Sequence, residues 1–230
     1  MKKILVIAAH PDDEILGVGG TIRRLVSEGC VANCIILGEG LTSRKVSRKD
    51  TSKTELDILR KCAQKSASII GYSNIEFYSL PDNRFDTIPL LAIIQIIDAA
   101  IKKYKPDTVF SHYHRDLNID HRRTFEAVLT ACRPMFDSCV DALYSFQIPS
   151  STEWNFSCGQ ESFCPNFFVD ITRTLDSKLQ AMNCYTTEIR DYPHPRSIVA
   201  LDAIAKTWGS TAGMFAAEAF HVVLQRMNIS

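Results

Sequence analysis

The densest group of side chains able to do chemistry near the start of the chain is the segment His-Pro-Asp-Asp-Glu at residues 10–14. It follows an apolar run at residues 3–9, which predicts a buried parallel strand. His10 ends that strand and Asp13 lies in the first turn of the next helix, so a nitrogen and an oxygen ligand can share one crevice. Asp12 lies between them, where a carboxylate can take a proton from an attacking water. The spacing therefore predicts part of a metal site with a general base beside it.

The alternative interpretation is that Asp12, Asp13 and Glu14 only cap a helix. It accounts for acidic residues in a first helical turn. It does not account for a histidine at the end of the preceding strand, so we favour the metal site.

A second polar stretch, at residues 112–121, contains three histidines and follows another predicted strand. Because the carboxyl ends of parallel strands meet at one edge of a sheet, this stretch should lie close to His10. We expect His121 to be the third metal ligand. Four further residues are assigned supporting roles. These are Asp116 and Asp120 as acceptors that orient the imidazoles, and His112 and His114 as groups that hold a developing oxyanion or protonate a leaving amine. Taken singly, each of the three histidines could instead be a surface or capping residue.

The elements that must position these residues alternate along the first two thirds of the chain. Expected strands lie at residues 3–9, 30–37, 75–80, 108–111 and 141–146, and expected helices begin near residue 11 and cover 54–70, 89–103 and 119–132. This alternation predicts an α/β protein with a Rossmann-like, doubly wound and mostly parallel sheet flanked by helices.

After residue 149 the pattern changes, and we expect a small C-terminal extension. A long loop covers 150–165, followed by a strand at 167–170, a helix at 171–189, a break at 192–195, a helix at 197–208 and a strand at 217–224. We expect one domain over residues 1–230, with a core at 1–149 and a C-terminal part at 150–230 that completes the site.

The composition excludes some function classes. The 230 residues include 26 basic and 26 acidic side chains and are 46% hydrophobic, which suits a sizeable core and argues against a nucleic-acid binder. No apolar stretch approaches the roughly 20 residues that span a bilayer. The apolar start is too short for a signal peptide, so we expect a cytoplasmic protein. The eight cysteines are interpreted as buried or free thiols, with Cys158 and Cys164 as the one pair to consider for metal or redox chemistry.

Several motifs together resemble one known family. The segment Ala-His-Pro-Asp-Asp-Glu is followed by a glycine-rich stretch at 17–20, and further matching segments lie at 80–86, 116–123 and 193–197. This combination, which extends over nearly the whole chain, resembles the PIG-L/LmbE-like family of zinc-dependent N-acetylglucosaminyl deacetylases.

The resemblance implies zinc ligands at His10, Asp13 and His121, with Asp12 as the general base and an N-acetylated sugar, free or in a conjugate such as a sugar nucleotide, as the substrate. Two imidazoles and one carboxylate also suit Fe²⁺. The chain departs from the family at Asn118, where many relatives carry a histidine that helps to stabilise the oxyanion. Asn118 could still donate a hydrogen bond to that oxygen.

Three residues are candidates for substrate binding, each with a structural alternative. Arg84 could bind a sugar hydroxyl or a phosphate, or could pair with a neighbouring aspartate. Trp154 could stack on a sugar or anchor the core. His194, restricted by Pro193 and Pro195, could reach the cleft or face solvent in a turn.

A basic run could form a lid that meets a substrate phosphate, although a solvated loop is the ordinary interpretation. It comprises Arg44, Lys45, Arg48, Lys49 and Lys53. The competing functions are a hydratase or another amidase on the same scaffold, and a catalytically inactive sugar-nucleotide-binding module. Association into a homo-oligomer is compatible with all of them.

Overall fold

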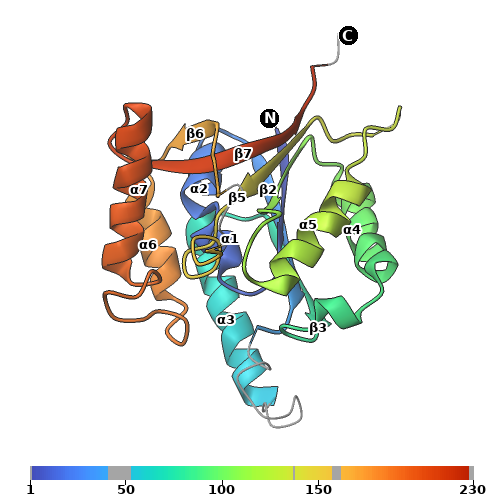
Figure 1. Cartoon of the computed structure of the whole chain (residues 1–230), viewed down its shortest axis with the longest axis horizontal. Coiled ribbons are helices and arrows are strands. Elements are labelled where there is room, and N and C mark those ends of the chain that lie inside the picture. Colours follow the sequence, from blue (N-terminus) through green and yellow to red (C-terminus); the bar gives the residue numbers. More distant parts are fainter. Residues whose placement is uncertain (1, 41–52, 137, 157–161, 228–230) are drawn as a thin grey trace.

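A single mixed sheet runs through the molecule (Figure 1). The computed structural model describes all residues except 1, 41–52, 137, 157–161 and 228–230. The strands follow the order β3-β2-β1-β4-β5-β7-β6, and their bounds are β1 Lys3–Ala8, β2 Val31–Gly38, β3 Asn74–Leu80, β4 Thr108–His112, β5 Ala142–Phe146, β6 Phe167–Asp170 and β7 Ala217–Gln225. The first five strands pair in parallel, whereas β7 is antiparallel to both β5 and β6. The predicted α/β class with a mostly parallel sheet is confirmed.

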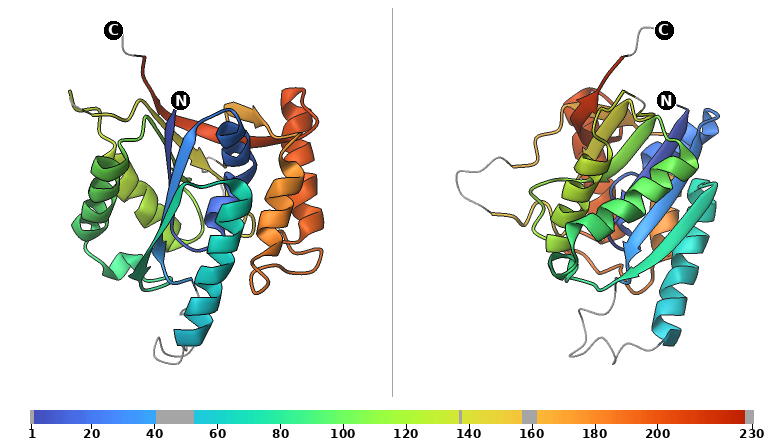
Figure 2. Two further views of the ribbon diagram at one scale, coloured as in Figure 1. Left: turned by 180° about the vertical axis from the view of Figure 1, so that it is seen from behind. Right: turned by 90° about the vertical axis from the view of Figure 1, so that its right-hand side faces the viewer.

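Helices cover both faces of this sheet (Figures 1 and 2). One face carries α1 Asp13–Leu16, α2 Gly19–Ser27, α3 Lys53–Ile70, α6 Leu175–Asn183 and α7 Ile198–Ala212. The other carries the short 3₁₀ turn η3 Phe85–Thr87 with α4 Leu90–Tyr104 and α5 Ile119–Ala131. Side chains of β1 alternate between the two cores, with Ile4 and Val6 on the first face and Leu5 and Ile7 on the second. The alternation is the two-residue period of a strand that is buried on both sides.

The topology brings the two histidine-bearing segments together. Strands β1 and β4 are neighbours in the sheet, although about a hundred residues separate them, and Val6 of β1 pairs with Phe110 of β4. The strand order changes direction between them, because β2 and β3 extend to one side and β5 to the other. Ligands of open α/β sheets bind outside the carboxyl ends of the strands at such a switch point.

Two expected helices differ from the structure. The helix expected from residue 11 is interrupted at Gly17 and Val18, which separate α1 from α2, because glycine is a poor helix former and Val18 lies outside the helical region at φ −146°. The helix expected at 171–189 covers only Leu175–Asn183. A pair of threonines that favour helices weakly follows its end.

The glycine at the interruption allows close packing of α1 on the sheet. A Cβ added to Gly17 would lie 2.3 Å from Cδ2 of Phe146 in β5, which is closer than any real contact. We expect Gly17→Ala to lower the free energy of unfolding by about 1–3 kcal/mol, the usual cost of overpacking. Urea unfolding of G17A, F146L and G17A/F146L checks this, since removing the clash should make the double variant lose less than the sum of the single ones. An unfolding midpoint for G17A equal to that of the parent would contradict it.

The predicted cysteine pair and the predicted basic lid fall partly outside the described residues. Cys158 and the basic residues between 41 and 52 are among those not described, so the cysteine pair and the lid stay predictions. No disulfide joins the cysteines of the described residues. Among the described residues there is no helix with the length and apolarity to cross a membrane.

Candidate metal centre

Three side chains from different segments converge at the switch point. His10 follows β1, Asp13 begins α1 and His121 lies in the first turn of α5, and their ligand atoms all lie within 4.8 Å of one another. Asp13 Oδ2 is 3.5 Å from Nδ1 of His10 and 3.4 Å from Nε2 of His121. At most 8% of each residue is exposed. Two imidazoles and a carboxylate at these separations suit one divalent cation.

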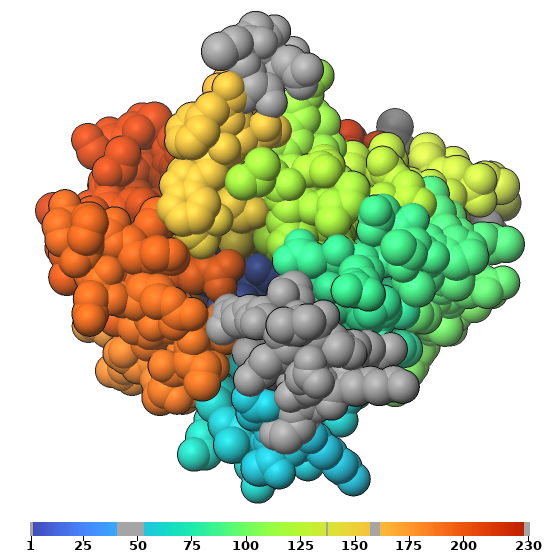
Figure 3. All heavy atoms as spheres, turned by 60° about the horizontal axis from the view of Figure 1, so that its bottom comes forward, coloured from blue at the N-terminus to red at the C-terminus, as the bar shows by residue number. Residues whose placement is uncertain are grey.

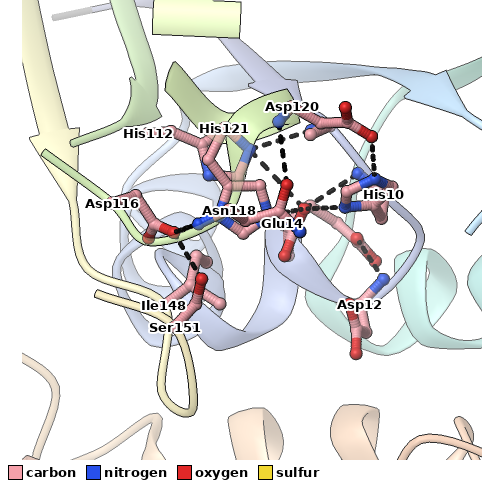
Figure 4. A network of polar contacts seen from close by, with 12 residues as sticks. His10, Asp12, Glu14, His112, Asp116, Asn118, Asp120, His121, Ile148 and Ser151 are labelled. Carbon is pink, nitrogen blue, oxygen red and sulfur yellow. Dashed lines mark hydrogen bonds and ion pairs between the residues drawn. The ribbon is translucent and has the colours of Figure 1, made fainter. Parts of the chain in front are cut away.

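The imidazole nitrogens that face away from this cluster meet carboxylates (Figure 4). Nε2 of His10 lies 2.9 Å from Asp120 Oδ2, and Nδ1 of His121 lies 3.0 Å from Asp116 Oδ1. Burial alone would lower the pKa of His121, but Asp13 and Asp116 raise it to about 9. A carboxylate behind a metal-ligating histidine fixes the ring and its tautomer. The arrangement leaves Nδ1 of His10 and Nε2 of His121 for the cation.

These two carboxylates are themselves held in place. Asp120 accepts hydrogen bonds from the backbone N–H groups of Asn83, at 2.6 Å, and Phe85, at 2.9 Å. Asp116 accepts from the hydroxyls of Ser151 and Thr152. The loop after β3 therefore supports the ring of His10, and the start of the C-terminal part supports the ring of His121.

Two buried atoms of the cluster indicate that it holds a ligand. Among the described residues, Asp13 Oδ1 and both ring nitrogens of His121 have no hydrogen-bond partner, although Nδ1 of His121 lies 3.0 Å from Asp116 Oδ1; Asp13 Oδ1 and His121 Nε2 are the two without a carboxylate behind them. Buried polar atoms without partners are rare in native proteins, so an orphaned acceptor and an orphaned imidazole nitrogen in one cluster require an explanation. A cation held by the Asp13 carboxylate and the two imidazoles would give His121 Nε2 a partner, and the donor set therefore fits the expected metal.

Asp12 lies beside the cluster without being part of it. Its carboxylate accepts a hydrogen bond at 2.8 Å from Nη1 of Arg196, and it lines a cavity of about 130 Å³. The other described residues lining this cavity are His10, Pro11, Gly40, Asp82, Asn83, Asn118, Glu188 and Arg196. Burial raises the pKa of Asp12 well above its ordinary value, and the Arg196 guanidinium opposes that shift. In Figure 3, residues from the start of the chain, in dark blue, form the floor of a hollow between the orange C-terminal part and the cyan-green segment.

The predicted oxyanion residues lie in different places. Asn118 lines the cavity and caps α5, its Oδ1 accepting from the N–H of Asp120 at 2.8 Å. The amide nitrogen of Asn118 is therefore the atom available to a ligand. His112 is fully buried, where its Nε2 accepts from the N–H of Ala9 at 2.8 Å, and its ring stacks on His121 at 4.1 Å. The structure does not bring His114 to the cluster. Its ring packs against Tyr113, Phe125 and His221.

The predicted substrate-binding residues Arg84, Trp154 and His194 are not among the described residues that line the cavity, and each is linked to it only through a neighbour. Trp154 and His194 meet edge to face, with ring centroids 5.8 Å apart. His194 Nδ1 accepts from the N–H of Arg196, which lines the cavity. Arg84 is exposed and directly follows the lining residue Asn83.

Several residues of the site were missed from the sequence. Within the segment 193–197, the sequence predicts a site role for His194 and none for Arg196. The available signal for Arg196 was its position directly after the prolines at 193 and 195 and just before a predicted helix, which restricts where its guanidinium can reach. Four further residues have no local signal in the sequence. Ser151, Thr152 and Tyr185 contact the site across 35 to 171 positions, and Glu188 contacts it only through Arg196.

The fold and the cluster define an α/β protein with a candidate mononuclear metal centre at the carboxyl edge of its sheet. The family model described as PIG-L, GlcNAc-PI de-N-acetylase, matches residues 5–132. This is more than half of the chain, which therefore belongs to the PIG-L family, as the motifs predicted.

Individual relatives agree with this membership. The chain is 28% identical to a diacetylchitobiose deacetylase of Thermococcus kodakarensis over 97% of this chain and 84% of the relative. It is 29% identical to a 4-oxalmesaconate hydratase of Pseudomonas putida over 80% of this chain and 72% of the relative. Among solved structures, a conserved protein of Thermus thermophilus superposes with a TM-score of 0.76 at 21% identity, covering 100% of this chain and 98% of that one. The N,N′-diacetylchitobiose deacetylase of Pyrococcus horikoshii superposes at 0.75 with 23% identity, covering 97% and 84%. At such identities, these structures establish the fold alone.

Proposed function

We propose that the chain is a metal-dependent hydrolase that removes an N-acetyl group from an amino sugar or a sugar conjugate, sugar nucleotides included. The observation that carries the proposal is the pairing of three convergent candidate ligands with a further acidic group, Asp12, that lies outside the ligand set and lines a cavity together with the ligand His10. A protein that only binds a sugar needs no proton acceptor beside a metal. Membership of a family described as a de-N-acetylase supports the same reaction.

The cation, Zn²⁺ or Fe²⁺, would be held by His10, Asp13 and His121, and when bound it supplies the Lewis acidity that lowers the pKa of a water and polarises the amide carbonyl. Asp12 accepts a proton from the attacking water as its oxygen bonds to the carbonyl carbon. Asn118 donates a hydrogen bond from its amide nitrogen to the carbonyl oxygen as that oxygen becomes negative. Asp12 then gives its proton to the nitrogen as the carbon–nitrogen bond breaks, and the amine takes the remaining proton of the water, so that one amide and one water become acetate and a protonated amine.

In this proposal the remaining predicted residues bind the substrate, stabilise the oxyanion or support a metal ligand. Trp154 and His194 form one side of the sugar site, and Arg84 meets a hydroxyl or phosphate further out. The oxyanion role goes to Asn118 because it lines the cavity. His112 uses Nε2 to accept from the backbone and supports the ring of His121.

A second candidate is the hydration of a small unsaturated dicarboxylate, favoured by the similarity to the hydratase of Pseudomonas putida. It would use the same cation and the same Asp12. Substrate assays separate the two reactions, because only amide hydrolysis releases acetate.

Metal removal is the first test of the proposal. Protein purified without added metal is expected to contain a single equivalent of zinc or iron. It should release acetate from N-acetylglucosamine, N,N′-diacetylchitobiose or UDP-N-acetylglucosamine. Treatment with dipicolinate should reduce the rate to background, and adding back Zn²⁺ or Fe²⁺ should restore it, because the cation activates both the water and the carbonyl. Acetate release that persists in metal-free protein would contradict the proposal.

A further inference from the structure

The backbone of Asp12 is in a conformation that residues with a Cβ seldom adopt. Its φ is 105° and its ψ −28°, and it is one of four non-glycine residues with positive φ in the described part of the chain. Such backbone persists only where the surrounding structure holds it, and it is found preferentially at functional sites. Here the strained residue lies between His10 and Pro11 on one side and Asp13 on the other, so its geometry determines where the Asp12 carboxylate points.

A buried carboxylate holds this backbone. Glu14 is 0% exposed, and its Oε2 accepts a hydrogen bond at 3.0 Å from the N–H of Asp12 (Figure 4). The other oxygen, Oε1, accepts from the hydroxyl of Tyr185, which is also 0% exposed and follows α6 in the C-terminal part. Within the described structure, Glu14 neither belongs to a ligand cluster nor lines the cavity. It is a fully buried acid that the proposed reaction does not use.

We propose that Glu14 and Tyr185 form a latch that sets the direction of the Asp12 carboxylate; they are positioning residues, and the inference rests on the proposed role of Asp12 as general base. With Glu14 in place, the N–H of Asp12 is paired and the positive φ is maintained, which turns the carboxylate toward Arg196 and the cavity. Without the acceptor, the buried N–H has no partner and the residue relaxes toward ordinary backbone angles. The carboxylate then moves away from the position in which it receives a proton.

The metal ligands do not depend on this latch. The N–H of His10 donates to Asp13 Oδ2 at 2.8 Å, and the rings of His10 and His121 rest on Asp120 and Asp116. Loss of Glu14 should therefore disturb the proton transfer and leave the cation in place.

Glu14→Met tests the latch, since methionine has a similar length and carries no oxygen acceptor, only a weakly accepting thioether sulfur. We expect kcat for acetate release from N,N′-diacetylchitobiose to fall roughly 10- to 100-fold, the effect of misplacing a catalytic group by about 1 Å. Metal content and KM should stay unchanged. Glu14→Gln retains one oxygen acceptor for the N–H of Asp12 and should recover most of the loss. Wild-type kcat for E14M, alongside a strongly impaired D12N variant, would overturn the latch while leaving the proposed function intact.

Two tyrosine-to-phenylalanine substitutions test the latch without changing Glu14 itself, and each removes a single hydroxyl group. Tyr185→Phe removes the hydroxyl that orients the Glu14 carboxylate and should lower kcat roughly 2- to 10-fold, as the loss of one buried hydrogen bond predicts. Tyr72→Phe removes a hydroxyl that donates, at 3.3 Å, to the backbone oxygen of the same glutamate, and should leave kcat unchanged. If E14M fails to fold, the comparison of Y185F with Y72F tests the latch instead. Equal kcat values for these two variants would overturn the inference.

A double-mutant cycle separates positioning from a general structural role. If Glu14 acts only through Asp12, E14M should cause no further loss of residual turnover in the D12N background. A purely structural role predicts that the two losses multiply, which would overturn the latch. Full activity of D12N alone would instead overturn the proposed function on which the latch rests.

Discussion

Replacing Asp12 with asparagine is expected to lower kcat for acetate release by roughly 10²- to 10⁴-fold, the range usual for loss of a general base. Asparagine has nearly the same shape and can keep an oxygen near Arg196, but it cannot accept a proton from water. The metal should be retained, because Asp12 lies outside the proposed ligand set of His10, Asp13 and His121. Steady-state kinetics on N,N′-diacetylchitobiose, together with metal analysis of the same preparation, measures both quantities.

Asp86→Asn is the matched control for this substitution. Asp86 is an exposed aspartate in the short η3 turn, and it does not line the cavity among the described residues. D86N should keep the parental kcat and metal content. If the kcat of D12N equalled that of D86N, a group other than Asp12 would have to accept the proton from the attacking water.

The parts of the fold predicted from sequence are those whose signal is local. The buried strands were recognisable as short apolar runs, and β1 was placed correctly because its residues 4–8 are apolar and lead into a polar turn. Alternating strands and helices then implied a parallel order, and the carboxyl ends of β1 and β4 had to lie at the same edge. The shared edge predicts that His10 and His121 lie close together, and the structure places their ligand atoms within 4.8 Å.

The parts that could not be predicted depend on contacts between distant residues. Arg196 reaches Asp12 across 184 positions, and Tyr185 reaches Glu14 across 171. Nothing local to residue 185 distinguishes it from other buried tyrosines. Likewise, the three histidines at 112–121 were equivalent by composition, and only the direction of each side chain separates His121, in the cluster, from His114, which packs against aromatic rings.

Replacing His121 with alanine is expected to abolish metal retention and, with it, acetate release. One of three protein ligands would be lost, and Asp13 and His10 alone would leave the cation held by two groups. Removal of only the supporting carboxylate, as in Asp116→Asn, should weaken metal affinity by a smaller factor of roughly 10–100. Metal content after dialysis against a weak chelator, followed by titration with Zn²⁺, measures the metal affinities of the parent, D116N and H121A under the same conditions.

His114→Ala gives the corresponding control for metal retention, because it removes an imidazole from the same ten-residue stretch without touching the cluster. H114A should keep its metal through the same dialysis. Retention of stoichiometric metal by H121A would mean that the three side chains do not share a cation. The orphaned Asp13 Oδ1 and His121 Nε2 would then need another partner. The expected order of affinity is parent and H114A first, then D116N, then H121A, and it follows directly from which atoms face the cluster and which support it from behind.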